Sequence, residues 1–156
     1  MILRTFCFLT LDRHQPPKYI IFLFFHWQGK PLSKINKNGG KTSVVINSEV
    51  FQLLERSLAI SKLTKGCFDI TVGTLKQHFN FKNENFEMPS KELIRDALND
   101  VGYQSIVLDK AKSSIVFNAP KMKISFNAIG KGYAADKVKK LWQNNGVTAG
   151  YVNASG

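Results

Sequence analysis

Residues 122–136 read Met122-Lys-Ile-Ser-Phe-Asn-Ala-Ile-Gly-Lys-Gly-Tyr-Ala-Ala-Asp136, and within this stretch the hydrophobic pattern changes its period. Apolar side chains alternate at Met122, Ile124 and Phe126, which is typical of a strand with one buried face. The sequence therefore predicts a strand that runs to about Phe126 and a helix over about 131–145. The apolar face of that helix is formed by Ala134, Val138, Leu141 and Trp142.

Upstream of this stretch, two short apolar segments are separated by a polar turn. Ser105–Leu108 and Ser114–Phe117 are each long enough for a strand, and Asp109–Lys112 lies between them. This pattern predicts a hairpin beside the strand that ends at Phe126. Two further short strands are predicted at Ser43–Asn47 and Thr148–Asn153.

Two more helices are indicated by capping residues and by apolar side chains at helical spacing. Ser48 begins the first, and Gly66 ends it as a left-handed C-terminal residue. Ser90 begins the second, and Gly102 ends it. Their apolar faces are formed by Phe51, Leu54 and Leu58 in the first helix and by Leu93, Ile94, Ala97, Leu98 and Val101 in the second.

The segments between these elements have no clear period. Lys30–Lys41 is polar and contains two glycines, and Lys76–Met88 is polar and aromatic, so both are predicted to be loops. Ile70–Leu75 is predicted to be a short loop or strand. The fold class is therefore α+β, with a hairpin-rich antiparallel sheet and helices packed on it. We expect an irregular N-terminal segment over 1–30 and one domain over 31–156.

The composition is that of an ordinary globular protein with a strong positive charge. Among 156 residues, 44% are hydrophobic and 21% are charged, which argues against disorder. The net charge of +11 fits a nucleic-acid surface, an anionic membrane surface, a site for a phosphate-rich ligand, or a lysine-rich composition without a specific role. A nucleic-acid surface needs exposed aromatic rings among the basic residues, whereas Tyr133 and Trp142 fall near the apolar face of their helix. We therefore predict no nucleic-acid partner.

The cysteines and the apolar runs indicate neither a disulfide framework nor a membrane span. The sequence has two cysteines, Cys7 and Cys67, and their spacing matches no metal-binding motif. The longest apolar run, Tyr19–Phe25, has seven residues, whereas a membrane helix needs about 20.

Two segments contain residue types suited to a ligand. In Asn127–Gly132, glycines allow a phosphate to approach the main chain, and free N–H groups at the helix start attract anions. Gly66–Leu75 groups small residues, hydroxyls and the carboxylate of Asp69 just after a helix end. Each segment also has a purely structural interpretation. The first would be a turn with a solvated Lys131, and the second a helix-end turn in which Asp69 caps backbone N–H groups.

Four segments together resemble, in order and separation, the FAD:protein FMN transferase family, also called ApbE-like. Ser33–Asn36 matches the family's Ser-x-Ile-Asn element, and Gly66–Leu75 matches Gly-x-Phe-Asp-x-Thr-x-Gly-x-Leu. Ala128–Asp136 matches Ala-Ile-x-Lys-Gly-Tyr-Ala-x-Asp, and Asn153–Gly156 begins the Asn-x-Gly-Gly-Asp element. The resemblance covers about residues 31–156. It implies a Mg²⁺-dependent enzyme that splits FAD, transfers FMN to a Ser or Thr hydroxyl of an acceptor protein, and releases AMP.

The resemblance also implies roles for individual residues. Lys131 would contact FAD, and the backbone carbonyl of Ala128 would be one ligand of Mg²⁺. Ser125 would lie at the cofactor site, where the family usually has an acid. His26 or Trp27 would supply a ring that stacks on the flavin. The FAD site would further be lined by Cys67, Phe68 and Asp69, with Thr71 and Gly73 beside them.

The match to the family pattern is incomplete. Ser155 stands where the family usually has glycine, and the family's carboxylate and Thr metal ligands come from a segment beyond Gly156. We therefore expect residues 31–156 to be a partial flavin transferase domain, either an incomplete and inactive copy or a non-catalytic remnant that binds flavin. Family members commonly act in the periplasm or at the inner membrane, but no lipid-attachment motif surrounds Cys7.

Overall fold

The computed structural model describes residues 26–79 and 86–152, and for residues 26–30 it describes the backbone only. The chain divides into two compact units. The larger unit is Trp27–Phe126, and the described residues of the smaller one are His26 and 127–152. None of the described helices combines the length and the apolar character that a membrane-spanning helix requires.

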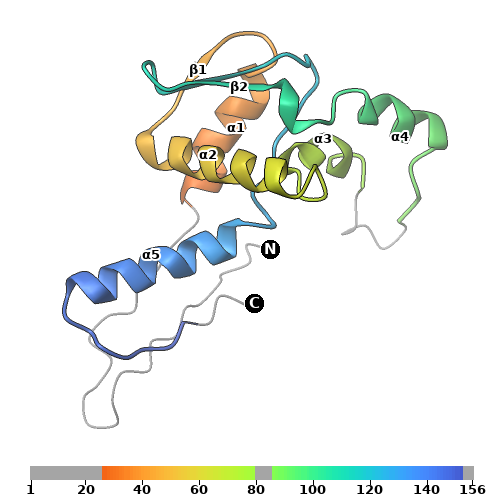
Figure 1. Cartoon of the computed structure of the whole chain (residues 1–156). Coiled ribbons are helices and arrows are strands. Elements are labelled where there is room, and N and C mark those ends of the chain that lie inside the picture. Colours follow the sequence, from red (N-terminus) through yellow and green to blue (C-terminus); the bar gives the residue numbers. More distant parts are fainter. Residues whose placement is uncertain (1–25, 80–85, 153–156) are drawn as a thin grey trace. The chain divides into compact units, whose positions relative to one another are not determined.

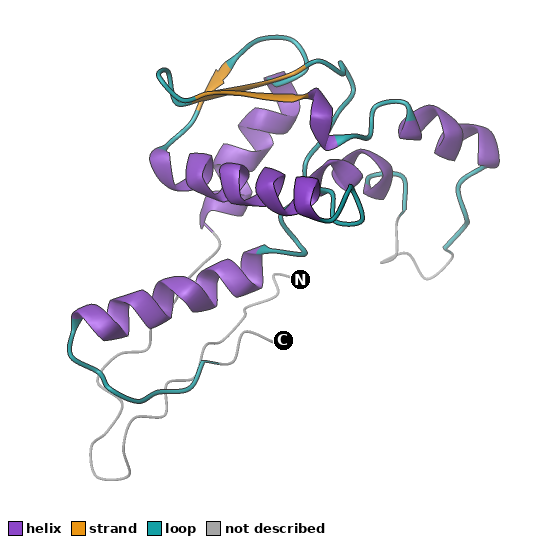
Figure 2. Ribbon diagram, viewed as in Figure 1, coloured by secondary structure: helices purple, strands orange, loops and turns teal. Residues whose placement is uncertain are grey.

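The larger unit contains a three-stranded antiparallel sheet (Figures 1 and 2). Strands β2 (Ile106–Asp109) and β3 (Ser114–Phe117) form the predicted hairpin, with Ile106 opposite Phe117 and Asp109 opposite Ser114. Strand β1 (Val44–Val45) pairs with the other edge of β3, so the strand order is β1-β3-β2. The hairpin is confirmed, and the strand predicted over Ser43–Asn47 is reduced to Val44 and Val45.

Helices α1 and α2 lie on the same side of this sheet (Figure 1). Helix α1 is His26–Asn38, so the prediction of a loop from Lys30 is wrong. Pro31 lies inside this helix, and proline is normally a signal against a helix because it lacks an N–H. Ile35 on the same helix is fully buried, and this packing outweighs the local preference.

Helix α2, Ser48–Leu63, has the predicted position but a different cap. The N-cap is Asn47, not Ser48, because the Asn47 Oδ1 atom accepts a hydrogen bond of 2.8 Å from the Val50 N–H. Gly66 has φ +88°, as predicted for a left-handed residue after a helix, and its N–H donates to the Ser61 carbonyl at 2.8 Å.

The buried face of α2 contains two serines that the apolar pattern did not indicate. Ser57 and Ser61 are both fully buried, whereas Leu58 of the predicted stripe is only half-buried. Their hydroxyls donate to backbone carbonyls one turn earlier, at 2.7 Å to Leu53 and 3.0 Å to Ser57. Within the described part of the chain, no buried side-chain nitrogen or oxygen lacks a hydrogen-bond partner.

Short helices follow α2. The segment predicted as a loop or strand over Ile70–Leu75 is helical instead, with a 3₁₀ turn η1 at Ile70–Val72 and helix α3 at Gly73–Lys76. Helix α4 (Lys91–Leu98) begins as predicted, since the Ser90 hydroxyl accepts from the Leu93 N–H at 3.2 Å. A second 3₁₀ turn, η2 (Tyr103–Ser105), leads from Gly102 into β2.

Residues 122–126 are extended but do not join the sheet. Met122, Ile124 and Phe126 are buried, as the alternating pattern predicted, yet the structure assigns no strand here. The prediction that residues 122–126 pair as a strand is therefore wrong, whereas the predicted burial of Met122, Ile124 and Phe126 is confirmed. The hydrogen bonds of this main chain go to side chains and to a turn, as detailed below.

The smaller unit contains helix α5, Gly130–Asn144, which confirms the predicted third helix to within a residue at each end. Gly146, with φ +73°, ends it. The chain from Val147 to Val152 has no strand pairing, so the predicted final strand is wrong over its described part. Asn153 lies outside the described residues.

Gly73→Ala is expected to lower the free energy of unfolding by about 1–3 kcal/mol. The cause is steric, because a Cβ at this position would lie 2.7 Å from the Lys123 carbonyl oxygen. Gly132→Ala is the matched control, since nothing lies within 4 Å of a Cβ there and alanine is the better helix former. Urea unfolding followed by circular dichroism measures both changes, and wild-type stability in Gly73→Ala would contradict the steric argument.

Candidate functional site

The Gly66–Leu75 segment connects the end of α2 to α3. After Gly66, the Cys67 and Phe68 N–H groups donate to the carbonyl and the hydroxyl of Thr64, both at 3.1 Å. These bonds hold a closed turn that leaves Cys67 exposed as a free thiol and Phe68 half-buried. Two candidate FAD contacts are therefore accessible from solvent on a turn with a defined main chain.

The carboxylate of Asp69 is a hydrogen-bond hub. Its Oδ1 atom accepts from the Thr71 N–H at 2.8 Å and from the Thr71 hydroxyl at 2.7 Å. Its Oδ2 atom accepts from the Tyr103 N–H at 2.9 Å. The Thr71 hydroxyl in turn accepts from the Gly102 N–H at 2.9 Å. We call Asp69, Thr71, Gly102 and Tyr103 the Asp69 hub.

The Asp69 hub joins the Gly66–Leu75 segment to Gly102 and Tyr103, with separations of 31 and 34 residues for its two long-range bonds. It confirms the structural interpretation in which Asp69 caps local N–H groups. The link to residues 102–103 was not predicted. Only the occurrence of Val101-Gly102-Tyr103 after the α4 pattern could have suggested it.

Gly73 and Thr74 face the extended segment 122–126. The absence of a side chain at Gly73 lets the main chain of Lys123 and Ile124 approach closely. Thr74 is fully buried, and its hydroxyl accepts from the Lys123 N–H at 2.8 Å. Gly73 and Thr74, at the end of this motif, therefore pack against the main chain of Lys123 and Ile124.

The Asn127–Lys131 turn leads into α5. Ala128 and Lys131 are both exposed, as their predicted roles require. Helix α5 begins after Ile129, whose side chain makes no cap hydrogen bond to the first turn. Gly132 has open space around it and an ordinary φ, so no contact within the described residues requires a glycine there.

Ser125 lies just before this turn and is half-buried. Its N–H donates to the Ile70 carbonyl at 2.8 Å, which ties the end of the extended segment to the first residue of η1. The main chain of Ser125 thus belongs to the larger unit with the Asp69 hub, whereas Lys131 belongs to the smaller unit.

Other predicted site residues cannot be placed. The side chains of His26 and Trp27 and the whole of Asn153–Gly156 lie outside the described residues. Among the residues that are described, no group of three or more His, Cys, Asp and Glu side chains could hold a metal ion. The described part of the chain therefore does not by itself provide a complete Mg²⁺ site.

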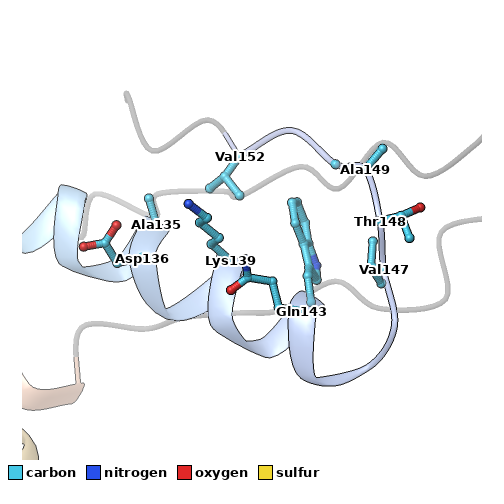
Figure 3. Close-up of a pocket in the computed structure, with 10 residues that line it drawn as sticks. Ala135, Asp136, Lys139, Gln143, Val147, Thr148, Ala149 and Val152 are labelled. Carbon is cyan, nitrogen blue, oxygen red and sulfur yellow. The ribbon is translucent and has the colours of Figure 1, made fainter.

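The smaller unit contains a hollow of about 350 Å³ between α5 and the segment that follows it. Figure 3 shows Lys139 and Gln143 on α5, with Thr148 and Val152 on the returning chain. Of the sequence motifs, only the last two residues of Ala128–Asp136, Ala135 and Asp136, line this hollow among the described residues. Its lining is Ala135, Asp136, Lys139, Trp142, Gln143, Val147, Thr148, Ala149, Gly150 and Val152.

This α+β arrangement and its motif segments are those of a known family of flavin transferases. The model of the ApbE family matches residues 23–156, and the chain belongs to that family. It is 28% identical to the FAD:protein FMN transferase of Buchnera aphidicola subsp. Baizongia pistaciae over 129 residues, which are 80% of this chain. It is also 28% identical to that of Klebsiella pneumoniae (strain 342) over 122 residues, which are 78% of this chain.

Solved structures of the family have the same fold. The apo flavinyl transferase ApbE of Pseudomonas stutzeri matches with a TM-score of 0.72 at 24% identity, over 81% of this chain and 40% of its own. The ApbE protein of Thermotoga maritima matches with a TM-score of 0.66 at 32% identity, over 72% of this chain and 37% of its own. The chain spans 38% and 39% of the length of the two transferases from Buchnera and Klebsiella.

Asp69→Ala is expected to lower the free energy of unfolding by about 1.5–3 kcal/mol, the range for hydrogen bonds to a charged group. The variant leaves the Tyr103 N–H and the buried Thr71 hydroxyl without their acceptor. Asp96→Ala, which removes an exposed carboxylate from α4, is the control for the change in net charge. Chemical denaturation measures both, and equal losses in the two variants would contradict a structural role for Asp69.

Proposed function

We propose that this chain provides part of the FAD site of an FAD:protein FMN transferase. The observation that carries the proposal is the family match over residues 23–156, which includes the segments with defined geometry described above. The relatives from Buchnera and Klebsiella are both FAD:protein FMN transferases. The described geometry supports the proposal because Cys67, Phe68 and Lys131 are accessible to a ligand.

The proposed reaction is a phosphoryl-type transfer at the pyrophosphate of FAD. The oxygen of an acceptor Ser or Thr hydroxyl attacks the phosphorus on the FMN side and forms a new P–O bond. The bond from that phosphorus to the bridging oxygen breaks, and AMP leaves with that oxygen. The hydroxyl proton is transferred to a base or to solvent. Positioning and charge stabilisation supply most of the catalysis in such reactions.

Some of the proposed site residues would contact FAD, and others would hold the shape of the site. Lys131 would contact FAD by charge at the start of α5, where the helix N-terminus favours anions, and Cys67 and Phe68 would line the site. Asp69, Thr71 and Gly73 would lie at the site, and their observed hydrogen bonds and close packing support a role in holding its shape. Ser125 would lie nearby, with its main chain fixed to Ile70.

Magnesium is a further part of the proposal. The exposed turn at Ala128 makes its backbone carbonyl available as one oxygen ligand. Mg²⁺ prefers octahedral oxygen ligation and commonly uses waters and substrate phosphates beside one or two carboxylates. When bound, the ion would neutralise charge on the pyrophosphate. The described residues supply no carboxylate cluster for it, so no step of the reaction is assigned to residues that would hold the ion.

Lys131→Ala is expected to weaken FAD binding by about 1.5–3 kcal/mol, the range for a hydrogen bond to a charged group. Lys140→Ala is the matched control, because it removes an exposed lysine from the same helix and changes the net charge equally. Titration of flavin fluorescence measures both affinities. If the two variants lose the same affinity, the contribution of Lys131 is only that of net charge.

Covalent transfer is tested with the purified chain, FAD, Mg²⁺ and an acceptor protein that contains a Thr flavinylation site. The proposal that this chain provides part of an FAD site predicts that it binds FAD, and covalent transfer is measured in the same mixture. Flavin fluorescence that stays on the acceptor after denaturing electrophoresis would demonstrate the transferase activity directly. Absence of FAD binding would contradict the proposed function.

A further inference from the structure

Residues 123–125 form an extended segment whose main chain is held by three different elements. The segment is half-buried to buried, with Ile124 only 2% exposed. A buried main chain must have its N–H and C=O groups paired, and no strand of the described sheet lies beside this one. The partners are the side chains of Asn36 and Thr74 and the backbone of Ile70.

Asn36 pairs with Ile124 as a neighbouring strand would. Its Nδ2 atom donates to the Ile124 carbonyl at 3.0 Å, and its Oδ1 atom accepts from the Ile124 N–H at 2.8 Å. The two residues are 88 positions apart in the sequence. Because a primary amide presents the same donor and acceptor as a peptide group, Asn36 replaces one residue of a β-ladder.

Thr74 and Ile70 hold the residues on either side. The Thr74 hydroxyl accepts from the Lys123 N–H at 2.8 Å and donates to the Lys123 carbonyl at 3.2 Å. The Ile70 carbonyl accepts from the Ser125 N–H at 2.8 Å. Three consecutive residues are therefore fixed by α1, α3 and η1, and we call Asn36, Thr74 and Ile70 the backbone clamp.

The position of the clamp in the chain gives it a functional consequence. Ala128 follows Ser125 by three residues, so the last clamped residue lies within about 10 Å of the proposed metal-ligand carbonyl. The segment between them is a turn with exposed Asn127 and Ala128. The order of this turn therefore depends on how firmly its first end is held.

We propose that Asn36 and Thr74 are positioning residues for the Asn127–Lys131 turn. They contact the main chain before the turn and act on the proposed FAD and Mg²⁺ site through it. This proposal deepens the proposed function and rests on it for the ligand. It assigns a role to the Ser33–Asn36 motif that differs from contact with the ligand.

Backbone ¹⁵N relaxation of the 156-residue chain tests the proposal in the variants Asn36→Ala and Thr74→Val. In the wild type we expect order parameters of about 0.85 for residues 123–125 and for residues 127–129, as in rigid backbone. In both variants we expect values below about 0.6 in both segments, while β3 keeps its wild-type values. Titration with FAD is expected to show at least about tenfold weaker binding in both variants.

Two substitutions serve as controls. Asn38→Ala removes an amide from the same helix, but that amide bonds only to the Lys34 carbonyl of its own helix at 3.0 Å, so the wild-type values should remain. Thr74→Ser keeps the hydroxyl that bonds to Lys123, so it should restore the order and the FAD affinity that Thr74→Val loses.

Several results would overturn the proposal. Loss of order in β3 as well would show a general structural role, and so would failure of both variants to fold. Loss confined to 123–125, with residues 127–129 unchanged, would show that the clamp does not control the turn. Wild-type FAD affinity in both variants would also overturn it. If the wild-type chain itself binds no FAD, the proposed function fails, and the relaxation data alone decide whether the clamp orders the turn.

Discussion

The main-chain polar groups of residues 123–125 must be paired in a buried position without a neighbouring strand. The structure meets this constraint with the Asn36 amide, the Thr74 hydroxyl and the Ile70 carbonyl. Each of these partners comes from a different element, so α1, η1 and α3 are all held to one stretch of chain. The close approach also requires a residue without a Cβ at Gly73. The larger unit is organised around this segment as much as around its small sheet.

The Asp69 hub likewise pairs main-chain N–H groups with side chains, in this case the N–H groups of Gly102 and Tyr103. Asp69 and Thr71 bind the N–H groups of Gly102 and Tyr103, which would otherwise have no partner at the entry to η2. Ile70 lies between Asp69 and Thr71, and its carbonyl accepts the hydrogen bond from the Ser125 N–H in the backbone clamp. The short 3₁₀ turn η1 therefore connects both hydrogen-bond systems. Its geometry could not change without disturbing the segment that leads to Ala128.

The sequence predicted the elements whose signals are local. The hairpin of β2 and β3, the N-cap of α4 and the extent of α5 follow from apolar spacing and from residues next to the element, whereas α4 ends at Leu98 and not at the predicted Gly102. Helix α1 was missed because Lys30–Lys41 is polar and contains two glycines, while the burial of Ile35 depends on residues far away in the chain. The strand at 122–126 was predicted because alternating burial looks the same whether the main chain pairs with a strand or with side chains.

In the candidate site, too, local features could be predicted from the sequence and long-range contacts could not. The motif segments and the exposure of Lys131 could be predicted, because motifs and charges are visible in the sequence. The hydrogen bonds from Asp69 to Tyr103 and from Asn36 to Ile124 could not, because they join positions 34 and 88 residues apart. The hydrophobic pattern and the spacing of motifs along one sequence contain no information on which distant residues are hydrogen-bonded to each other.

A ladder made of side chains restricts sequence drift in a way that an ordinary strand pair does not. Two paired strands exchange hydrogen bonds through the backbone, so almost any residue can replace another without loss of pairing. Where the side chains of Asn36 and Thr74 supply the hydrogen bonds, only a side chain of the same shape and hydrogen-bonding capacity can replace either of them without loss of pairing. Asn36, a defined position of the Ser-x-Ile-Asn element, and Thr74, an unspecified position of its own element, are therefore both constrained by the requirements of folding alone. A divergent chain that retains them has kept its architecture, and its chemistry must be judged from the residues that face the ligand.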